Sequence, residues 1–299
     1  MKVIKFTTGQ EAVTRVDTKD FAQTYMDRVG KNEAYRILDG GDIKHLAVCP
    51  KCNNPVVILG VFRHIDQKAH ARHCRKGAPG LAEYNEYKYI NCPFHRRHAN
   101  YIGEYVPEFE KEDRKKIYEL ARDHFDKAVY LIERTVGIRI NISMAEEMAG
   151  YYAAARAYEY KYATTDNIPW FLLYGFPGFN LYHKVIKKDS ALYRHLKKAG
   201  GVKLIASNKE GYVYVEEDGI TPFDRHLICD EYGYDVDKDD EIHEHLAFAI
   251  LETMDDGTTR AINRFRLNVD PFYFGNLVGY ADWKRNNILC EAVRKYFVT

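Results

Sequence analysis

The chain has almost no net charge and no long apolar run, and each of these features excludes a class of protein. Its 299 residues carry 44 Lys and Arg against 43 Asp and Glu. Global charge therefore favours neither nucleic acid, nor a membrane surface, nor an acidic substrate, and any electrostatic signal must be local. No stretch approaches the roughly 18 apolar residues of a membrane span, and the N-terminus is too polar after Phe6 for a secretory signal. We expect a cytoplasmic protein without membrane contact.

Internal repeats and low-complexity linkers are also absent, whereas 46% of the residues are hydrophobic. A chain of this length and composition can bury a substantial core. Its composition changes in three zones: residues 1–106 hold β-like runs and most cysteines, 107–200 hold helical patterns, and 201–299 are rich in β-like runs. The expected fold class is α+β, with a zinc-ribbon-like N-terminal module, a helical middle, and a β-rich C-terminal part closed by a helix.

Helical patterns dominate the middle zone. Apolar residues recur every three or four positions over 117–132, which predicts one amphipathic helix ended by Gly137. Ser143 with Glu146 forms a capping-box signature before a second helix, and Ser190 is expected to begin a third. The segment "NIPWFLLYGFPGF" between them is expected to be core, with a partner surface as the alternative.

Alternating or β-branched runs predict strands in the outer zones. In the first zone these runs are 3–6, 45–48, 55–61 and 87–90. In the third zone, "VKLIA" with "GYVYVE" and "HLAFAILETM" with "TTRAINRFRLNVD" predict two hairpins, the second around an Asp-Gly turn.

Cysteine is scarce, with six residues, yet four of them fall in one window: Cys49, Cys52, Cys74 and Cys92. Disulfides are not expected, because nothing in the sequence indicates export. Thiolates and imidazoles at short spacing are instead what zinc requires. Since such thiolate-rich sites are generally structural, the expected cofactor is a structural Zn²⁺ ion.

Two short ligand pairs give the leading assignment. "CPKC" and "CPFH" each lie between β-like runs, in the form of a zinc knuckle. Two knuckles joined by a long connection would bind zinc through Cys49, Cys52, Cys92 and His95.

Two other ligand sets stay open. His70 and Cys74 would share one face of a helix, and with the CPKC pair they have the spacing of a small finger. A mixed set would combine the CPKC pair with Cys92 and either His73 or Cys74.

The stretch 46–95, with its "CPKC" turn, following β-run and "HARH" segment, resembles the N-terminal zinc module of CoiA-like competence proteins. In that family a restriction-type nuclease domain accompanies the module, so the resemblance implies DNA processing.

The ligand window is locally basic and contains interleaved tyrosines and phenylalanines. Basic side chains neutralise phosphates and aromatic rings stack on exposed bases, so the composition suits nucleic acid. The residues expected to bind it are Arg72, Arg75, Lys76, Arg96 and Arg97.

Two alternative functions come from the later zones. A metal-dependent nuclease would use Asp235, Asp237, and His243 or His245, because carboxylates and imidazoles supply acid, base and metal ligands. A protein-interaction or inhibitor protein would use the aromatic segment 167–179 as its contact surface, with the zinc purely structural.

Overall fold

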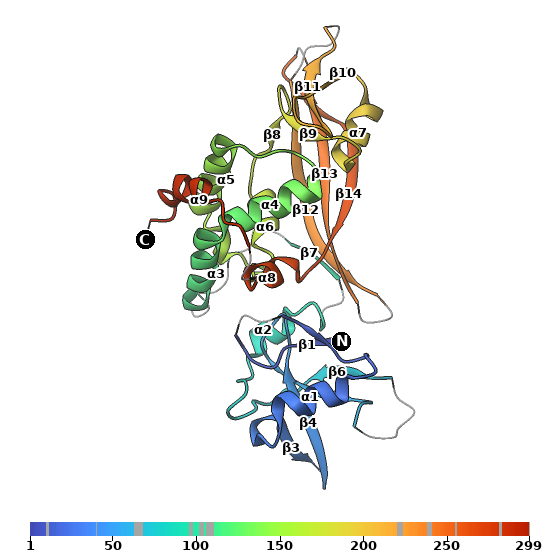
Figure 1. Cartoon of the computed structure of the whole chain (residues 1–299), viewed down its shortest axis with the longest axis vertical. Helices are drawn as coiled ribbons and strands as arrows, with labels where there is room; N and C mark the ends of the chain where they lie inside the picture. The colour runs from blue at the N-terminus through green and yellow to red at the C-terminus, as the bar shows by residue number, and fades with distance from the viewer. Residues whose placement is uncertain are drawn as a thin grey trace. The chain divides into compact units, whose positions relative to one another are not determined.

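The computed structural model describes residues 1–9, 12–39, 41–62, 68–95, 98–101, 105, 111–219, 224–237, 241–254, 256–280 and 283–298. The chain divides into two compact units (Figure 1). The first comprises Met1–Ala99 with Tyr234–His243, and the second comprises Asn100–Gly233 with Glu244–Thr299. The helical and β-rich zones, expected as separate regions, therefore share one unit. Helices and antiparallel sheets confirm the α+β class.

The first unit is built on a four-stranded antiparallel sheet of order β3-β4-β5-β6. Its elements are β1 (Val3–Ile4), β2 (Thr14–Arg15), α1 (Phe21–Val29), β3 (Arg36–Asp39), β4 (Asp42–Val48), β5 (Pro55–Leu59), β6 (His70–His73) and α2 (Glu86–Ile90). Helix α1 buries Phe21 and Tyr25 in a core that also contains three of the cysteines. The Tyr25 hydroxyl donates to the Leu46 carbonyl at 2.6 Å, which ties the helix to β4.

The prediction of a strand at 87–90 is wrong, because these residues belong to helix α2. Asn85 is the N-cap, and its side-chain oxygen accepts a hydrogen bond from the backbone N–H of Lys88 at 2.9 Å. This cap satisfies one of the free donors of the first turn. Tyrosine favours strands only weakly and in context, so the local cap decides the conformation.

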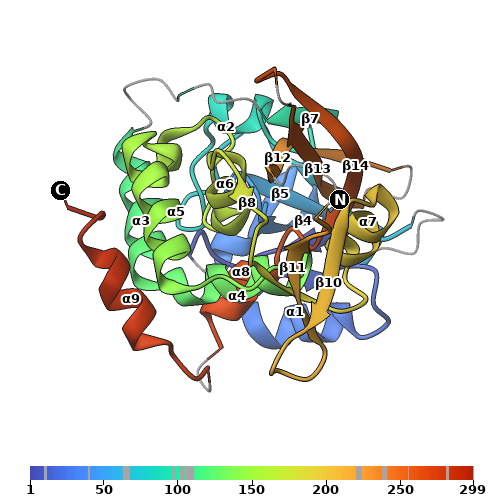
Figure 2. The same ribbon diagram turned by 90° about the horizontal axis from the view of Figure 1, so that it is seen from above.

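The second unit contains a helical group, a long-stranded sheet and a smaller sheet (Figures 1 and 2). Its helices are α3 (Lys111–Asp123), α4 (Phe125–Val136), α5 (Ile142–Ala154), α6 (Ile168–Tyr174), α7 (Ala191–Ala199), α8 (Tyr273–Val278) and α9 (Asn287–Arg294). Its strands include β8 (Phe179–Asn180), β9 (Val185–Lys187), β10 (Val202–Ala206), β11 (Tyr212–Glu217) and β14 (Thr259–Val269).

The larger sheet has the order β14-β13-β12-β7, and β8 also pairs with β12. Strands β12 (Arg225–Val236) and β13 (Ile242–Thr253) each contribute residues to both units, as does β7 (His98–Tyr101). The smaller sheet has the order β10-β11-β9. Both hairpins expected from the sequence are confirmed, since β10 pairs with β11 and β13 pairs with β14, each antiparallel.

The predicted helices are confirmed with changes at their ends. The single helix expected to end at Gly137 is two, α3 and α4, with His124 between them. Gly137 ends α4 with φ 90°, a left-handed conformation that favours glycine. The second helix is capped by Asn141, two residues before the expected box, whereas Ser190 caps α7 as expected.

The apolar segment after Asn167 is core, as expected, so the alternative of a contact surface is wrong. Trp170, Phe171, Leu172 and Leu173 are all buried in α6. This helix packs against α4 and α5, which removes these four side chains from water. No helix among the described residues is long and apolar enough to cross a membrane.

A buried ion pair links two strands of the larger sheet. Arg225 on β12 and Glu252 on β13 are 4% exposed each, with Nη2 and Oε1 2.7 Å apart. Arg260 on β14 contacts the other Glu252 oxygen at 3.1 Å. Although burial raises the pKa of Glu252, hydrogen bonds from both arginines bring it below its ordinary value. The carboxylate therefore contributes stability above its unfolded pKa, and the contribution is lost as pH falls through the folded pKa.

Replacing Glu252 with Gln should leave the Arg225 charge buried and uncompensated, at a cost of about 3 to 5 kcal/mol in the free energy of unfolding. Urea unfolding at neutral pH measures this cost, and the difference from wild type should shrink in acid. Glu291→Gln removes an exposed partner of Arg294 and should leave unfolding nearly unchanged. Equal effects of the two variants would contradict a role for the buried pair.

Candidate metal centre

Cys49 and Cys52 lie in the turn that joins β4 to β5. The last paired residues of the hairpin are Val48 and Pro55. Across the turn, the Cys49 N–H donates to the Asn54 carbonyl at 2.9 Å, and the Asn53 N–H donates to the Cys49 carbonyl at 3.0 Å. Asn53 has φ 56°, a left-handed conformation that asparagine tolerates. The turn therefore holds both thiols at the end of the hairpin.

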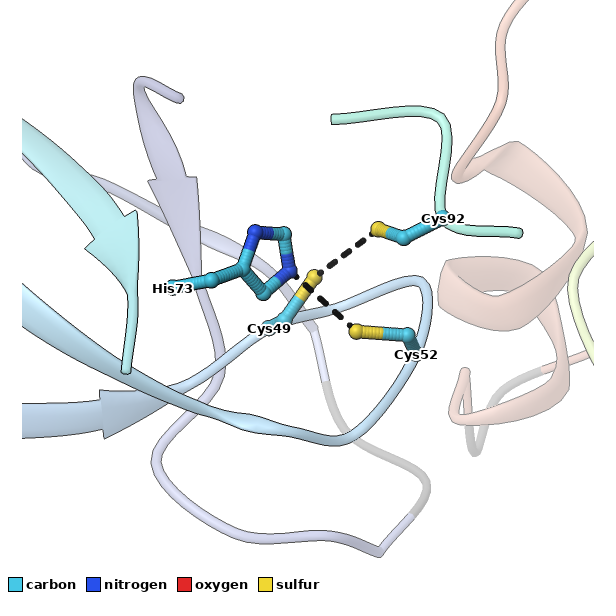
Figure 3. Close-up of side chains that lie close together, drawn as sticks. All are labelled: Cys49, Cys52, His73 and Cys92. Carbon is cyan, nitrogen blue, oxygen red and sulfur yellow. Dashed lines mark hydrogen bonds between the residues drawn. The ribbon is translucent and has the colours of Figure 1, made fainter. Parts of the chain in front are cut away.

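The other two members of the site come from different elements. His73 is the last residue of β6 and pairs with Val56 of β5, which places it beside the turn. Cys92 follows α2, and its backbone N–H donates to the Tyr89 carbonyl at 3.1 Å. Figure 3 shows these four side chains pointing toward one another from the hairpin turn, the strand and the loop after the helix.

The four ligand atoms lie within 4.8 Å of one another. Cys49 Sγ is 3.7 Å from Cys92 Sγ, and Cys52 Sγ is 3.2 Å from His73 Nε2. In a tetrahedral site with metal–sulfur bonds of about 2.3 Å, two sulfurs lie about 3.8 Å apart and a sulfur and a nitrogen about 3.6 Å apart. The sulfur pair already has this spacing, and His73 reaches it by moving about 0.4 Å.

Burial makes several negative charges costly at this site. Cys49, Cys52 and Cys92 are all buried and free of disulfides. Burial raises the pKa of the Cys52 and Cys92 thiols, and the adjacent Cys49 sulfur raises both further. Burial also opposes ionisation of Cys49, but hydrogen bonds from the adjacent thiols and His73 bring its pKa well below the ordinary value. One thiolate is thus stabilised by the protein alone, and further thiolates require a cation.

Asn54 supports the turn from outside the ligand set. It is fully buried, and its Nδ2 donates to Cys52 Sγ at 3.3 Å and to the Asn85 carbonyl at 3.1 Å. Its Oδ1 accepts the Asn85 backbone N–H at 2.6 Å. Asn85 is also the cap of α2, the helix that leads to Cys92. A single side chain therefore connects the hairpin turn to the segment carrying the third cysteine.

Tyr89 of α2 packs against the histidine ligand. Its ring meets the His73 ring edge-on, with centroids 5.2 Å apart. Packing of this kind restricts the orientation of the imidazole, as groups behind metal ligands commonly do.

Three thiols and one imidazole provide a complete tetrahedral set. The cluster of Cys49, Cys52, His73 and Cys92 could therefore hold a metal ion with no position left for water. Catalytic sites keep such an open position, so this donor set suits a structural role.

The structure brings together three of the four ligands of the leading assignment and places His73 in the fourth position. It thus matches the mixed set. Among the described residues, the group of ligand atoms includes neither His95, nor His70, nor Cys74. His95 is exposed and stacks on Tyr89, with centroids 4.0 Å apart. His70 contacts the Lys68 carbonyl through Nδ1 at 2.8 Å.

The ligand set that combines the CPKC pair with His70 and Cys74 is wrong, because these two residues do not lie on a helix. His70 and Cys74 were placed four apart on a helix, but β6 puts His70 in a strand and Cys74 just after it. An extended chain rises about 3.3 Å per residue, so side chains four apart are too far from each other to bind one ion.

Three of the five residues predicted to bind nucleic acid belong to the part of the chain that the structure describes. Arg72, Arg75 and Lys76 are exposed in and after β6. Arg96 and Arg97 lie outside the described residues.

The predicted nuclease residues do not form one group, because some lie in the first unit and His245 lies in the second. Asp237, Glu241 and His243 have ligand atoms within 4.8 Å of one another in the first unit, and His243 Nε2 is 2.8 Å from Asp237 Oδ2. His245, the alternative to His243 in the predicted nuclease site, is buried in the second unit, in contact with Glu231 and Arg266. Long side chains of the neighbouring strands cover it. Asp235 is half-buried and does not belong to the carboxylate group.

The chain matches no protein-family model, no curated protein and no solved structure.

Replacing one ligand should release the metal. Cys49→Ser and His73→Ala should each lower the bound metal from about one ion per chain, because three remaining donors hold it weakly. Cys74→Ser and His95→Ala are the matched controls and should retain it. Elemental analysis of the purified variants measures this. Retention in His73→Ala together with loss in His95→Ala would restore the two-knuckle ligand set.

Removing the support behind the turn should weaken the metal site without removing a ligand. Asn54→Ala should lower metal affinity about 10- to 100-fold, as loss of an outer partner typically does. Asn53→Gly is the control, because glycine accepts the left-handed conformation of that residue. Competition with a coloured chelator gives both affinities, and equal values would show that Asn54 does not support the site.

Proposed function

We propose that the cluster holds a structural zinc ion and that the module around it binds nucleic acid. The carrying observation is the set of three buried thiols and one half-buried imidazole whose ligand atoms lie within 4.8 Å of one another. Soft thiolate ligands in a tetrahedral arrangement select zinc over magnesium, calcium or manganese. A cytoplasmic location would keep these thiols reduced and available.

The basic segment next to the metal supports nucleic acid as the partner. Arg72 directly precedes the ligand His73, and Arg75 and Lys76 follow it, all with exposed side chains. A metal bound to His73 therefore fixes the backbone that presents these charges. Phosphate contacts by such side chains supply most sequence-independent affinity for nucleic acid. The resemblance to CoiA-like modules supports DNA as the polymer.

The two alternative functions have less support. A nuclease would depend on Asp237, Glu241 and His243, which are partly or fully exposed, and on an acid–base partner other than His245. A protein-interaction role loses its candidate surface, since the aromatic segment is buried. Manganese-dependent cleavage that Asp237→Ala abolishes would favour the nuclease.

The double change Arg72→Glu with Lys76→Glu should weaken nucleic-acid binding to a similar degree across sequences, because phosphate contacts carry little base information. The slope of log affinity against log salt should become shallower by about 1.4 to 1.8, the effect of losing two phosphate contacts. Fluorescence anisotropy at several salt concentrations measures both quantities.

The control is Lys19→Glu with Lys31→Glu, which makes the same charge change at two other exposed positions of the unit. This variant should keep the steeper salt slope. If wild-type protein with its zinc shows no salt-sensitive affinity for DNA or RNA at low ionic strength, the proposal fails.

A further inference from the structure

Tyr89 is the centre of a small stack of rings and charge beside the metal cluster. The His95 ring lies on it, with centroids 4.0 Å apart and an angle of 29° between the planes. The Arg75 guanidinium lies 5.2 Å from the Tyr89 centroid, and its Nη2 donates to the Tyr89 hydroxyl at 3.3 Å. Tyr89 also contacts the metal ligand His73.

The inner part of this stack is fixed and the outer part is open. Tyr89 is 9% exposed, whereas His95 and Arg75 are exposed. One face of the His95 ring is against Tyr89, so its exposure belongs to the other face and the edge. Arg75 lies two residues after His73, and His95 lies three residues after Cys92. Figure 3 shows His73 and Cys92 in one cluster, which brings together the two chain segments that carry the stack.

Proteins commonly bind unpaired bases with an exposed aromatic ring that lies beside an arginine guanidinium. Each base can stack on an aromatic ring, histidine included, while an arginine contacts the adjoining phosphate or adds a cation–π contact. In a duplex the base faces are covered by their neighbours, so this face offers nothing to paired DNA. A protein that bound nucleic acid through phosphate contacts alone would not need an exposed ring such as that of His95.

We propose that His95, supported by Tyr89 and flanked by Arg75, is a stacking site for an unpaired base, so that the partner is single-stranded nucleic acid. This inference rests on the proposed function and specifies its substrate class. The DNA and RNA forms share the stacking chemistry, and separate arms of the experiment distinguish them.

The test uses the zinc-loaded full chain and fluorescein-labelled probes of ~20 nucleotides: single-stranded DNA, single-stranded RNA and duplex DNA. His95→Ala should weaken binding to the preferred single strand about 5- to 150-fold, the range for losing one base stack. Its salt slope should stay at the wild-type value, because no phosphate contact is removed. Duplex binding should not change.

Two further variants make the result specific. His70→Ala removes an imidazole outside the stack and should bind like wild type. Tyr89→Phe keeps the supporting ring but removes the hydroxyl that holds Arg75, and it should weaken single-strand binding less than His95→Ala does. Zinc content equal to wild type shows that each variant has kept its fold.

The results distinguish the stacking site from nucleic-acid binding as such. Salt-dependent binding that Arg72→Glu with Lys76→Glu weakens, but that His95→Ala leaves unchanged, overturns the stacking site alone. Equal weakening of single strand and duplex by His95→Ala also overturns it. Absence of any salt-dependent binding by wild type overturns both the stacking site and the proposed function.

Discussion

The main constraint on the first unit is the cost of ionising three thiols that are buried side by side. Cys49, Cys52 and Cys92 lie together where water cannot screen them, and burial raises the pKa of two of them. Hydrophobic packing alone gives no reason to gather sulfurs at 3.7 Å with an imidazole beside them. A divalent cation would neutralise the thiolates, and metal binding and folding of this unit would then be coupled.

A short series of contacts connects the buried cysteine cluster to the surface of the first unit. Asn54 connects the hairpin turn to Asn85, the cap of the helix that leads to Cys92. From that helix, Tyr89 contacts the ligand His73 on one side and Arg75 and His95 on the other. Direct contacts therefore link the candidate metal cluster to exposed basic and aromatic groups. The second unit has a different basis, an apolar core with a buried ion pair across its sheet.

The sequence predicted those features that local chemistry decides. Both C-terminal hairpins, the cap at Ser190 and the clustering of cysteines follow from short patterns. The fourth ligand did not, because it depends on which residue of β6 pairs with Val56, a register that spacing along the chain cannot reveal. The helix at α2 was missed because its tyrosines resemble a strand, although Asn85 was a usable capping signal. Burial of His245 depends on side chains from neighbouring strands.

X-ray absorption at the zinc edge counts the ligands of a bound metal by type. A closed set of three thiolates and one imidazole gives three sulfurs at about 2.3 Å and one nitrogen at about 2.0 to 2.1 Å, with no oxygen ligand from water. Two sulfurs with two nitrogens, or a bound water completing the shell, would contradict the closed set of Cys49, Cys52, His73 and Cys92.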